Sequence, residues 1–329
     1  MASQHMNEFD LIARYFTRPA KRAVLGVGDD CALLQPAPGM QLAISSDMLV
    51  EGRHFFADVD PRALGHKALA VNLSDLAACG ATPLAFTLAL ALPHIDNAWL
   101  QGFSSGLWAL ADQHGCELVG GDTTRGPLNI CITVFGEVPR GQALLRSGAQ
   151  PGDDLYISGT LGDARLALEA LLGNISLSPD TLTQARARLE QPSPRVALGQ
   201  ALRGIATAAI DISDGLVGDL EHLLQASRVG ARLDTSIAIN LIANNPYADC
   251  HSGLFDASKM LACVLAGGDD YELAFTAPVA RRQAVEAASS VSQTPVTRIG
   301  QIEQAPGLRL VDAHGQPVVG VFRSFDHFA

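Results

Sequence analysis

The chain has 329 residues, of which 48% are hydrophobic and 17% charged, and its formal net charge is −11 at pH 7. This length predicts two domains, and the hydrophobic content is enough for packed cores, which excludes a disordered chain. Because a negative field repels nucleic acids and anionic lipids, we expect neither nucleic acid nor membrane as a partner.

The first half of the chain predicts a mixed α/β domain. A short amphipathic helix is expected over residues 7–16. Proline in the first turn and glycine at the end favour a helix over residues 61–80. The predicted strands are residues 41–45, 84–92, 116–119 and 128–138, with a further helix at 97–114. The resulting order, β-α-β-α-β-β, is close to a split βαβ arrangement.

A polar, glycine-rich joint at residues 146–153 precedes a second region in which strands and helices alternate. We therefore expect an α/β (α+β) fold with two domains, residues 7–140 and 141–329. In the second domain, strands are predicted at residues 154–158, 208–212, 230–233, 271–276 and 296–302, and helices at 163–172, 194–202, 216–227 and 257–265.

The sequence argues against a membrane protein and against a Walker-type nucleotide-binding protein. Residues 76–93 form an uncharged run of 18 residues, but Gly80 and Pro83 divide it into a helix end and a buried strand, so we expect no membrane span. The chain has three lysines, and none lies in a G-x-x-x-x-G-K-[ST] pattern, which excludes a Walker-type phosphate loop.

The six cysteines include no C-x-x-C pair, and most lie in apolar runs, so buried free thiols are expected rather than a zinc or redox site. Residues 1–5 resemble an expression-vector remnant before a natural start at Met6. No signal peptide is recognised, so a cytoplasmic location is expected.

Aspartates recur after apolar runs that end in small residues. They occur in five segments, residues 24–30, 42–47, 118–122, 209–215 and 265–270. A further aspartate, Asp75, differs because it shares an otherwise apolar helix face with Asn72. Each segment alone is explained by a turn or a helix cap. Together, carboxylates at strand ends can converge on one crevice of an α/β fold.

Clustered carboxylates repel one another, and Mg²⁺, which is often held by one or two carboxylates plus phosphate oxygens, relieves this repulsion. The pattern therefore predicts a Mg²⁺–phosphate site. Hydroxyls at Ser45, Ser46 and Ser213, together with glycine amides, could hold phosphate oxygens without lysine. Arg146 is either a cation for the transferred group or a solvated surface arginine, and His54 is either a site residue or structural.

These motifs resemble those of one family over essentially the whole chain, from about residue 9 to residue 328. Residues 72–83 (NLSDLAACGATP) and 120–126 (GGDTTRG) are the most specific, and further matches lie at residues 28–30, 45–47, 146–153, 211–215 and 267–273. The chain resembles the thiamine-monophosphate kinases. Their superfamily includes aminoimidazole ribonucleotide synthetase, selenophosphate synthetase and a hydrogenase maturation factor. The reactive cysteine or selenocysteine of selenophosphate synthetase has no counterpart in this chain.

The resemblance implies an N-terminal split βαβ-type domain whose sheet pairs across a homodimer, and a C-terminal α/β domain of the aminoimidazole ribonucleotide synthetase type. It places metal ligands at Asp30, Ser45, Ser46, Asp47, Asp75, Asp122, Asp211 and Asp214. It places ATP contacts at Gly121, Asp122, Arg146 and Ser213, and thiamine-phosphate contacts at His54, Asp269 and Phe322. The implied catalytic residues are Asp47, Asp122, Arg146 and Asp214.

Two positions depart from the family pattern. Asp269 stands where the family often has glutamate, and Phe322 where it often has tryptophan. Both replacements keep the chemistry, a carboxylate and an aromatic face for the thiazolium cation.

The implied activity is ATP-dependent phosphorylation of thiamine monophosphate to thiamine diphosphate, with several Mg²⁺ ions and direct in-line transfer. A phosphate monoester has its second pKa near ~6, so the attacking group is mostly a dianion and needs no general base. One alternative is a superfamily enzyme that acts on an amidine- or carbamoyl-bearing substrate. Two others are a nucleotide-binding regulatory protein and a structural dimer scaffold, both disfavoured by the complete set of aspartates.

Overall fold

The computed structural model describes residues 7–243, 257–320, 322, 324 and 325. The chain divides into two compact units. The first comprises Met1–Leu76 and Ala81–Gly141, and the second Ala77–Gly80 and Gln142–Ala329.

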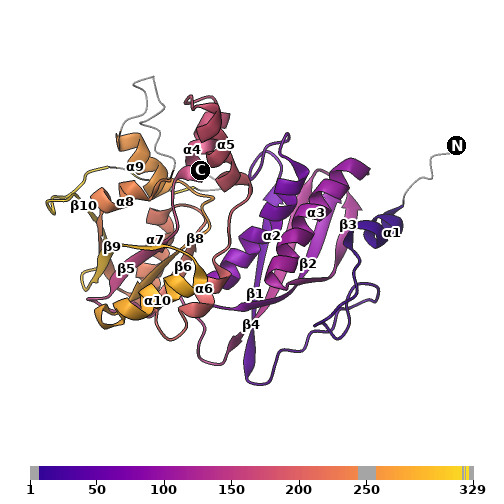
Figure 1. Ribbon diagram of the computed structural model, residues 1–329, viewed down its shortest axis with the longest axis horizontal. Coiled ribbons are helices and arrows are strands. Elements are labelled where there is room, and N and C mark those ends of the chain that lie inside the picture. Colours follow the sequence, from indigo (N-terminus) through magenta and orange to yellow (C-terminus); the bar gives the residue numbers. More distant parts are fainter. Residues whose placement is uncertain (1–6, 244–256, 321, 323, 326–329) are drawn as a thin grey trace. The chain divides into compact units, whose positions relative to one another are not determined.

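The first unit is a four-stranded sheet with two long helices on one face (Figure 1). Its strands, in spatial order, are β1 (Met40–Val50), β4 (Asn129–Pro139), β2 (Thr82–Leu92) and β3 (Glu117–Arg125). Strand β4 runs antiparallel to both neighbours, whereas β2 and β3 are parallel. The helices are α2 (Pro61–Ala78) and α3 (Asn97–His114). The predicted order of elements is confirmed.

The predicted N-terminal helix is also confirmed, in two parts. Helix α1 (Glu8–Leu11) continues directly into the π-helical turn η1 (Ile12–Phe16). A reciprocal capping box between Asn7 and Asp10 satisfies the first amides. This segment carries the aromatic side chains that line the pocket described below.

Helices α2 and α3 cross closely because glycine lies at their contact points. A Cβ atom at Gly65 would overlap the carbonyl oxygen of Phe103, and one at Gly106 would overlap that of Arg62. Helix α3 is capped by Asp96 and ends at Gly115 in the left-handed region (φ 58°). The close crossing fixes α2, the helix that bears the candidate Asp75, against α3.

The interpretation of Asp47 and Asp122 as strand-end residues is wrong, because both lie inside strands. Strand β1 runs five residues beyond the predicted end at residue 45, and β3 continues to Arg125 rather than stopping at residue 119. Both are the outer strands of their sheet. Side chains project from the two faces of a strand, and those of Asp47 and Asp122 remain half-buried and exposed, respectively, so these polar residues did not end the strands.

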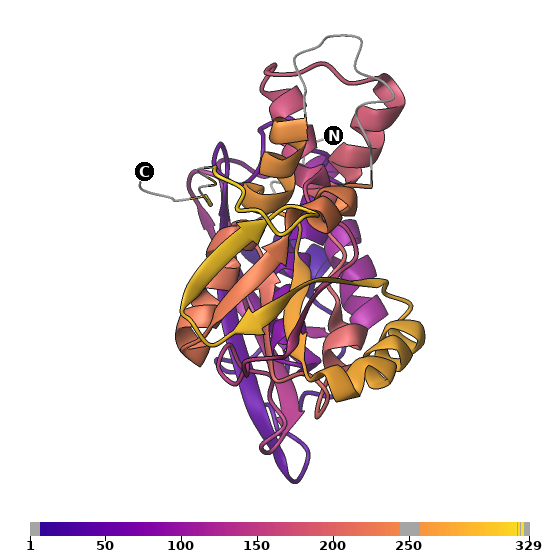
Figure 2. The same ribbon diagram turned by 90° about the vertical axis from the view of Figure 1, so that its left-hand side faces the viewer.

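The second unit contains a six-stranded mixed sheet (Figure 2). Its strands, in spatial order, are β10 (Gly307–Val311), β7 (Gly230–Asp234), β9 (Val296–Glu303), β5 (Asp154–Ser158), β8 (Glu272–Ala277) and β6 (Ala208–Ile212). The helices are α4 (Asp163–Leu171), α5 (Pro179–Glu190), α6 (Val196–Ala201), α7 (Leu216–Ser227), α8 (Thr235–Ala238), α9 (Ala257–Ala266) and α10 (Arg282–Ser292), with short 3₁₀ turns η2 (Ile239–Leu241) and η4 (Val279–Arg281). The α/β class is confirmed, although α5, α8, α10, β10 and the two 3₁₀ turns are additions to the elements predicted by range.

Two buried acidic side chains of this second sheet, Asp154 and Glu272, are paired with arginines. The Asp154 carboxylate, at the start of β5, accepts hydrogen bonds from Arg282 (2.6 Å) and Arg298 (3.2 Å). Burial alone would raise the pKa of Asp154, but these two arginines hold it below its ordinary value. Glu272, fully buried in β8, is bound by Arg188 and Arg195.

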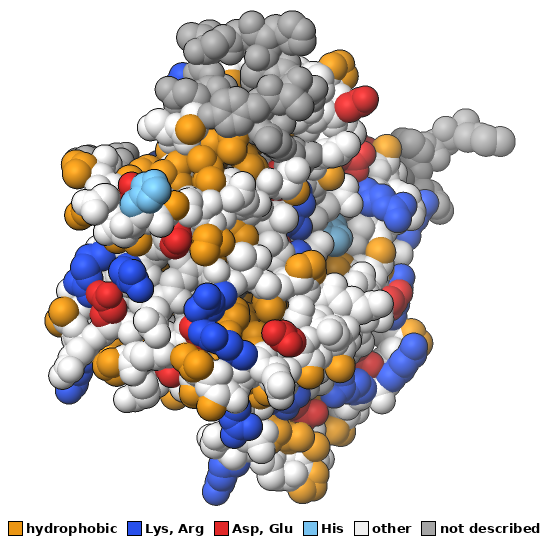
Figure 3. Space-filling view, turned by 60° about the vertical axis from the view of Figure 1, so that its left-hand side comes forward, with side chains coloured by type: hydrophobic (Ala, Val, Ile, Leu, Met, Phe, Trp, Pro, Cys, Tyr) orange, Lys and Arg blue, Asp and Glu red, His pale blue; other side chains and the backbone are white. Residues whose placement is uncertain are grey.

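On the face shown in Figure 3, side chains of both charges are interspersed.

Within the described residues, every helix is too short or too polar to cross a bilayer. The uncharged run at residues 76–93 is divided as predicted, since α2 ends at Ala78 and β2 begins at Thr82. The described cysteines form no disulfide with one another. Cys116 and Cys263 are buried, as expected, whereas Cys79 and Cys131 are only half-buried. Burial raises the pKa of the Cys263 thiol to about 12. Cys31 is exposed, contrary to the general expectation, and Cys250 lies outside the described residues.

Candidate active site

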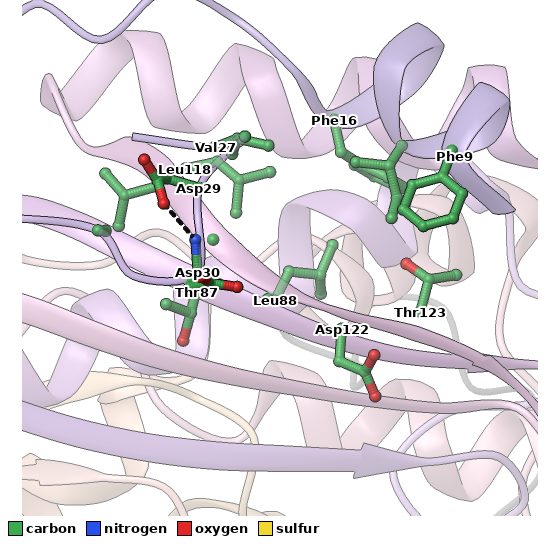
Figure 4. Close-up of a pocket in the computed structure, with 16 residues that line it drawn as sticks. Phe9, Phe16, Val27, Asp29, Asp30, Thr87, Leu88, Leu118, Asp122 and Thr123 are labelled. Carbon is green, nitrogen blue, oxygen red and sulfur yellow. Dashed lines mark hydrogen bonds between the residues drawn. The ribbon is translucent and has the colours of Figure 1, made fainter. Parts of the chain in front are cut away.

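A pocket of about 700 Å³ lies within the first unit, between β2, β3, residues 27–32 and the N-terminal helical segment. In Figure 4, Phe9 and Phe16 lie on one side and Asp29 and Asp30 on the other, while Asp122, which also lines the pocket, projects from β3 on the side away from Phe9. The pocket thus brings together the candidates Asp30, Gly121 and Asp122. It combines an apolar side with a carboxylate-rich side, an arrangement that suits a ligand with a flat base and a cation-bound phosphate chain.

Glycine at position 121 allows this approach of β3 to β2. Gly121 pairs with Leu88 and has φ 148°, and a Cβ atom there would overlap the Leu88 carbonyl oxygen. The strand can therefore present its backbone and the next side chain, Asp122, to the pocket. Across the pocket, the Asp30 amide donates to the Asp29 carboxylate at 2.8 Å, which fixes the turn between these two acidic residues.

A second group of candidates lies where β1 meets α2. The hydroxyl of Ser45 donates to the Asp75 carboxylate. The amide of Asp47 donates to Oδ1 of Asn72 at 3.1 Å, while Nδ2 of Asn72 donates to the Ala68 carbonyl one helical turn earlier. Buried Asn72 thereby links β1 to α2. It fixes the backbone position of Asp47 relative to the helix that bears Asp75. Sequence reasoning noted the spacing of Asn72 from Asp75 but gave Asn72 no role.

Ser46 does not join this group. Side chains alternate across a strand, so Ser46 points to the opposite face of the sheet, where its hydroxyl lies 3.0 Å from that of Thr133. The candidate His54 follows in the turn after β1. Its Nδ1 accepts the amide of Val50 at 2.9 Å, and buried Lys67 donates to its carbonyl oxygen. The bond to Nδ1 fixes the orientation of the imidazole ring, and the bond from Lys67 holds the backbone of His54.

In the second unit, the candidates Asp211, Ser213 and Asp214 lie at the end of β6 and in the turn that follows. Asp211 is buried, whereas Ser213 and Asp214 are half-buried. One oxygen of Asp219, in the first turn of α7, accepts the amides of Ser213 (3.1 Å), Asp214 (3.0 Å) and Gly215 (3.1 Å). Burial raises the pKa of Asp219 to about 6 although these amides lower it.

The candidate Asp269 lies in a backbone segment with unusual dihedral angles. Asp269 and Tyr271 both have positive φ, 67° and 51°, which non-glycine residues rarely adopt and which concentrate at functional sites. Their amides donate to the carbonyls of Ser213 and Ile212, both at 2.8 Å. Between them, Asp270 is buried, and one of its oxygens accepts the amide of Gly162 at 2.9 Å. Burial raises the pKa of Asp270 well above its ordinary value.

The remaining candidates of the second unit are Arg146 and Phe322. Arg146 is exposed, and its carbonyl oxygen accepts the hydroxyl of Ser227 at 2.9 Å. This bond anchors the joint to the end of α7 and leaves the guanidinium on the surface. Phe322 is half-buried and packs against the hydrophobic core of the unit.

Among the residues described, no three side chains of His, Cys, Asp or Glu lie close enough together to hold a metal ion by themselves. The donors present are carboxylate and hydroxyl oxygens, the type that Mg²⁺ prefers. Magnesium commonly takes only one or two protein carboxylates and completes its shell with phosphate oxygens and water. The donor sets of β1–α2 and of the pocket therefore fit a metal that binds together with a nucleotide.

Comparison with known proteins assigns the family. The AIR synthase related protein N-terminal domain matches residues 28–138, and the C-terminal domain of the same proteins matches residues 150–313. A thiamine-monophosphate kinase of Salmonella typhimurium is 46% identical over 330 residues, covering 98% of each chain. The chain belongs to the thiamine-monophosphate kinase family.

Solved structures of thiamine-monophosphate kinases support this assignment. The enzyme from Stenotrophomonas maltophilia K279a is 43% identical, with a TM-score of 0.81 over 94% of this chain and 95% of that one. The structure described as AaThiL complexed with AMPPCP and TMP is 29% identical, with a TM-score of 0.73 over 89% of each chain. The family resemblance inferred from the motifs is confirmed.

Three residues of this site were not selected by sequence reasoning. Asp29 neighbours a selected aspartate, Asn72 lies three residues from another, and Asp219 lies four residues after the glycine of a selected motif. The one sequence signal that could have identified these three residues is therefore their short distance along the chain from a selected motif. A single sequence could not show that these side chains turn back to hold or extend the motif.

Proposed function

We propose that this protein transfers the γ-phosphoryl group of ATP to the phosphate of thiamine monophosphate, giving ADP and thiamine diphosphate. The observation that carries the proposal is the 46% identity to a thiamine-monophosphate kinase over 98% of both chains. The related structure with AMPPCP and TMP supports both substrates. The acidic pocket of the first unit supports a cation-dependent nucleotide site.

In the proposed reaction, a phosphate oxygen of thiamine monophosphate attacks the γ-phosphorus in line. A new P–O bond forms while the bond from the γ-phosphorus to the β,γ-bridging oxygen breaks, and ADP leaves with that electron pair. The attacking group is already a dianion at neutral pH, so no side chain needs to remove a proton. No phosphorylated protein residue is formed.

The chain's own contribution is to position two polyanions. We propose that four residues contact ATP: Ser213, Asp122, the backbone at Gly121 and the guanidinium of Arg146. His54, Asp269 and Phe322 contact thiamine monophosphate. The residues proposed to hold Mg²⁺ are Asp30, Ser45, Ser46, Asp47, Asp75, Asp122, Asp211 and Asp214. When bound, Mg²⁺ neutralises phosphate charge and so reduces the repulsion between the substrates.

Ser46 is the least direct of these proposed ligands. Its side chain lies on the face of β1 opposite to Ser45 and Asp47, so its proposed contribution is a backbone oxygen or a side chain turned from its present position.

Residues 7–140 are proposed to form the ATP- and magnesium-binding domain, and residues 141–329 the second domain. We place the enzyme in the cytoplasm, where ATP is available.

We also propose a homodimer in which the sheet of the first unit pairs with that of a second copy. Outer strand β1 presents Leu42, Ile44 and Met48 on the face opposite α2, and these side chains are 43%, 60% and 53% exposed. A row of large apolar residues on an uncovered sheet face indicates an interaction surface. Sedimentation velocity of the purified protein tests this, and a monomer at micromolar concentration contradicts it.

The deciding experiment incubates purified protein with ATP, thiamine monophosphate and MgCl₂, and quantifies thiamine diphosphate by chromatography. Product that requires all three components is expected. ATP binding without product would favour another superfamily substrate, one bearing an amidine or carbamoyl group, or a regulatory protein. Absence of ATP binding would leave a structural scaffold and refute the proposed function.

A further inference from the structure

Asp219 makes an unusual set of hydrogen bonds for a residue without an assigned role. It is buried, and one of its oxygens accepts three consecutive amides, those of Ser213, Asp214 and Gly215. Gly215 has φ 120°, a conformation that favours glycine, which lets the chain curl around the carboxylate before α7 begins. The carboxylate therefore defines the shape of this turn from inside.

Amides that point inward direct the carbonyls of the same turn outward, and these carbonyls hold two further segments. The Ser213 carbonyl accepts the amide of Asp269 at 2.8 Å, and the Asp214 carbonyl accepts that of Phe325 at 3.1 Å. Nearby, the amide of Gly218 donates to the hydroxyl of Ser324 at 2.9 Å. One carboxylate thus supports the turn to which both other segments are attached.

The attached segments carry the residues assigned to different ligands. The turn itself bears Ser213 and Asp214, proposed for the nucleotide and its cation. The segment with positive φ values bears Asp269, and the C-terminal segment bears Phe322, both proposed for thiamine monophosphate. Since the positive φ of Asp269 is disfavoured for a residue with a side chain, that conformation depends on its anchoring bond to the turn.

We propose that Asp219 is a positioning residue that sets the nucleotide side and the thiamine side of the second unit together, an inference that rests on the proposed kinase function. It contacts neither substrate in this assignment. It acts through the backbone of residues 213–215, and its loss displaces both groups of ligands at once.

The test compares Asp219→Ala with Asp219→Asn. Asparagine has a side chain of the same size and retains one acceptor oxygen. The matched control is Ser178→Ala, which removes the N-cap hydroxyl of α5 in the same unit, a bond to the amide of Thr181 outside this turn. We expect Asp219→Ala to lower kcat/KM for both substrates by about 100-fold, since a displacement of about 1 Å can cost that much. Asp219→Asn is expected to restore part of this loss, and Ser178→Ala to leave both kcat/KM values at wild-type level.

Amide hydrogen exchange supplies a readout that does not depend on turnover. In Asp219→Ala, exchange is expected to accelerate at residues 213–215, at Asp269 and Tyr271, and at Phe325, with wild-type rates retained in α5. Accelerated exchange across the whole unit would mean general unfolding and would overturn the inference. So would folded Asp219→Ala protein with wild-type kcat/KM, or a loss confined to one substrate. If the wild-type protein makes no thiamine diphosphate, the proposed function fails, and the exchange pattern alone then decides whether Asp219 couples the three segments.

Discussion

The substitution Asp122→Asn separates catalysis from stability. Asp122 is exposed on β3, at the wall of the pocket it shares with Asp29 and Asp30, and no hydrogen bond of its carboxylate is found within the described part of the chain. Asparagine has the same size and removes one negative charge from an acidic pocket. The free energy of unfolding should therefore change by less than about 0.5 kcal/mol, the usual range for surface substitutions.

Activity should change far more. Removing one preorganised group that stabilises transition-state charge typically costs about 3–4 kcal/mol, or roughly 10²–10³-fold in kcat. We expect that loss in thiamine diphosphate formation at saturating ATP, together with a higher Mg²⁺ concentration for half-maximal rate. The assay is a magnesium titration of initial rates, with urea unfolding measured on the same preparation.

Asp112→Asn is the matched control. It makes the same change of charge in the same unit, at an exposed carboxylate paired with Arg18 on the surface. Its rate and magnesium dependence should equal those of the wild type, and its stability should change little. Near-normal activity of Asp122→Asn across the titration would refute the role given to this residue. A loss of stability matching the loss of rate would show that its role is structural.

Three further predictions concern assembly and stability. Ile44→Asp, which places a charge on the exposed apolar face of β1, should yield monomers in sedimentation velocity; an unchanged dimer would place the interface elsewhere. Gly106→Ala should lower the free energy of unfolding by about 1–3 kcal/mol in urea titrations, because the added methyl overlaps the backbone at Arg62 and forces α2 and α3 apart. Asp154→Asn should cost about 1–2 kcal/mol at neutral pH, a moderate value because both arginine partners are about half-exposed. Since the folded pKa of Asp154 is lowered, its contribution is present above the ordinary carboxyl pKa and disappears as pH falls through the folded value; a wild-type–variant difference that stays constant down to the lowest pH at which both proteins are folded would contradict this assignment.

Local rules predicted the helices of the first unit well. Proline at the start of α2 and the left-handed Gly115 after α3 are signals that belong to the backbone itself. Helix α10 and strand β10 were missed for a physical reason. Helix α10 is amphipathic, but it has few large apolar side chains and buries only Val285 and Ala288. Strand β10 is an outer strand with half-exposed side chains, so both elements carry too little hydrophobicity to stand out in the sequence.

The site was predictable in residue type but not in geometry. The aspartate-rich segments were recognisable, and the motif order led to the correct family. Their placement was not, because the polar residues of β1 look like a strand end until the pairing of Asp47 with Ile132 on β4 is known. The supporting role of Asp219 depends on three backbone amides, and nothing in a single sequence reports which amides a carboxylate reaches.

The alternation along β1 has a consequence for the variation this strand can tolerate. Successive residues face either α2, with Ser45 and Asp47, or the uncovered face, with Ile44 and Met48. A saturation scan of the strand should therefore give a phenotype of period two, with turnover lost at one set of positions and self-association at the other. Insertion of a single residue near Ser45 would exchange the two faces for the rest of the strand. Single-residue insertions and deletions should therefore be far less tolerated here than substitutions.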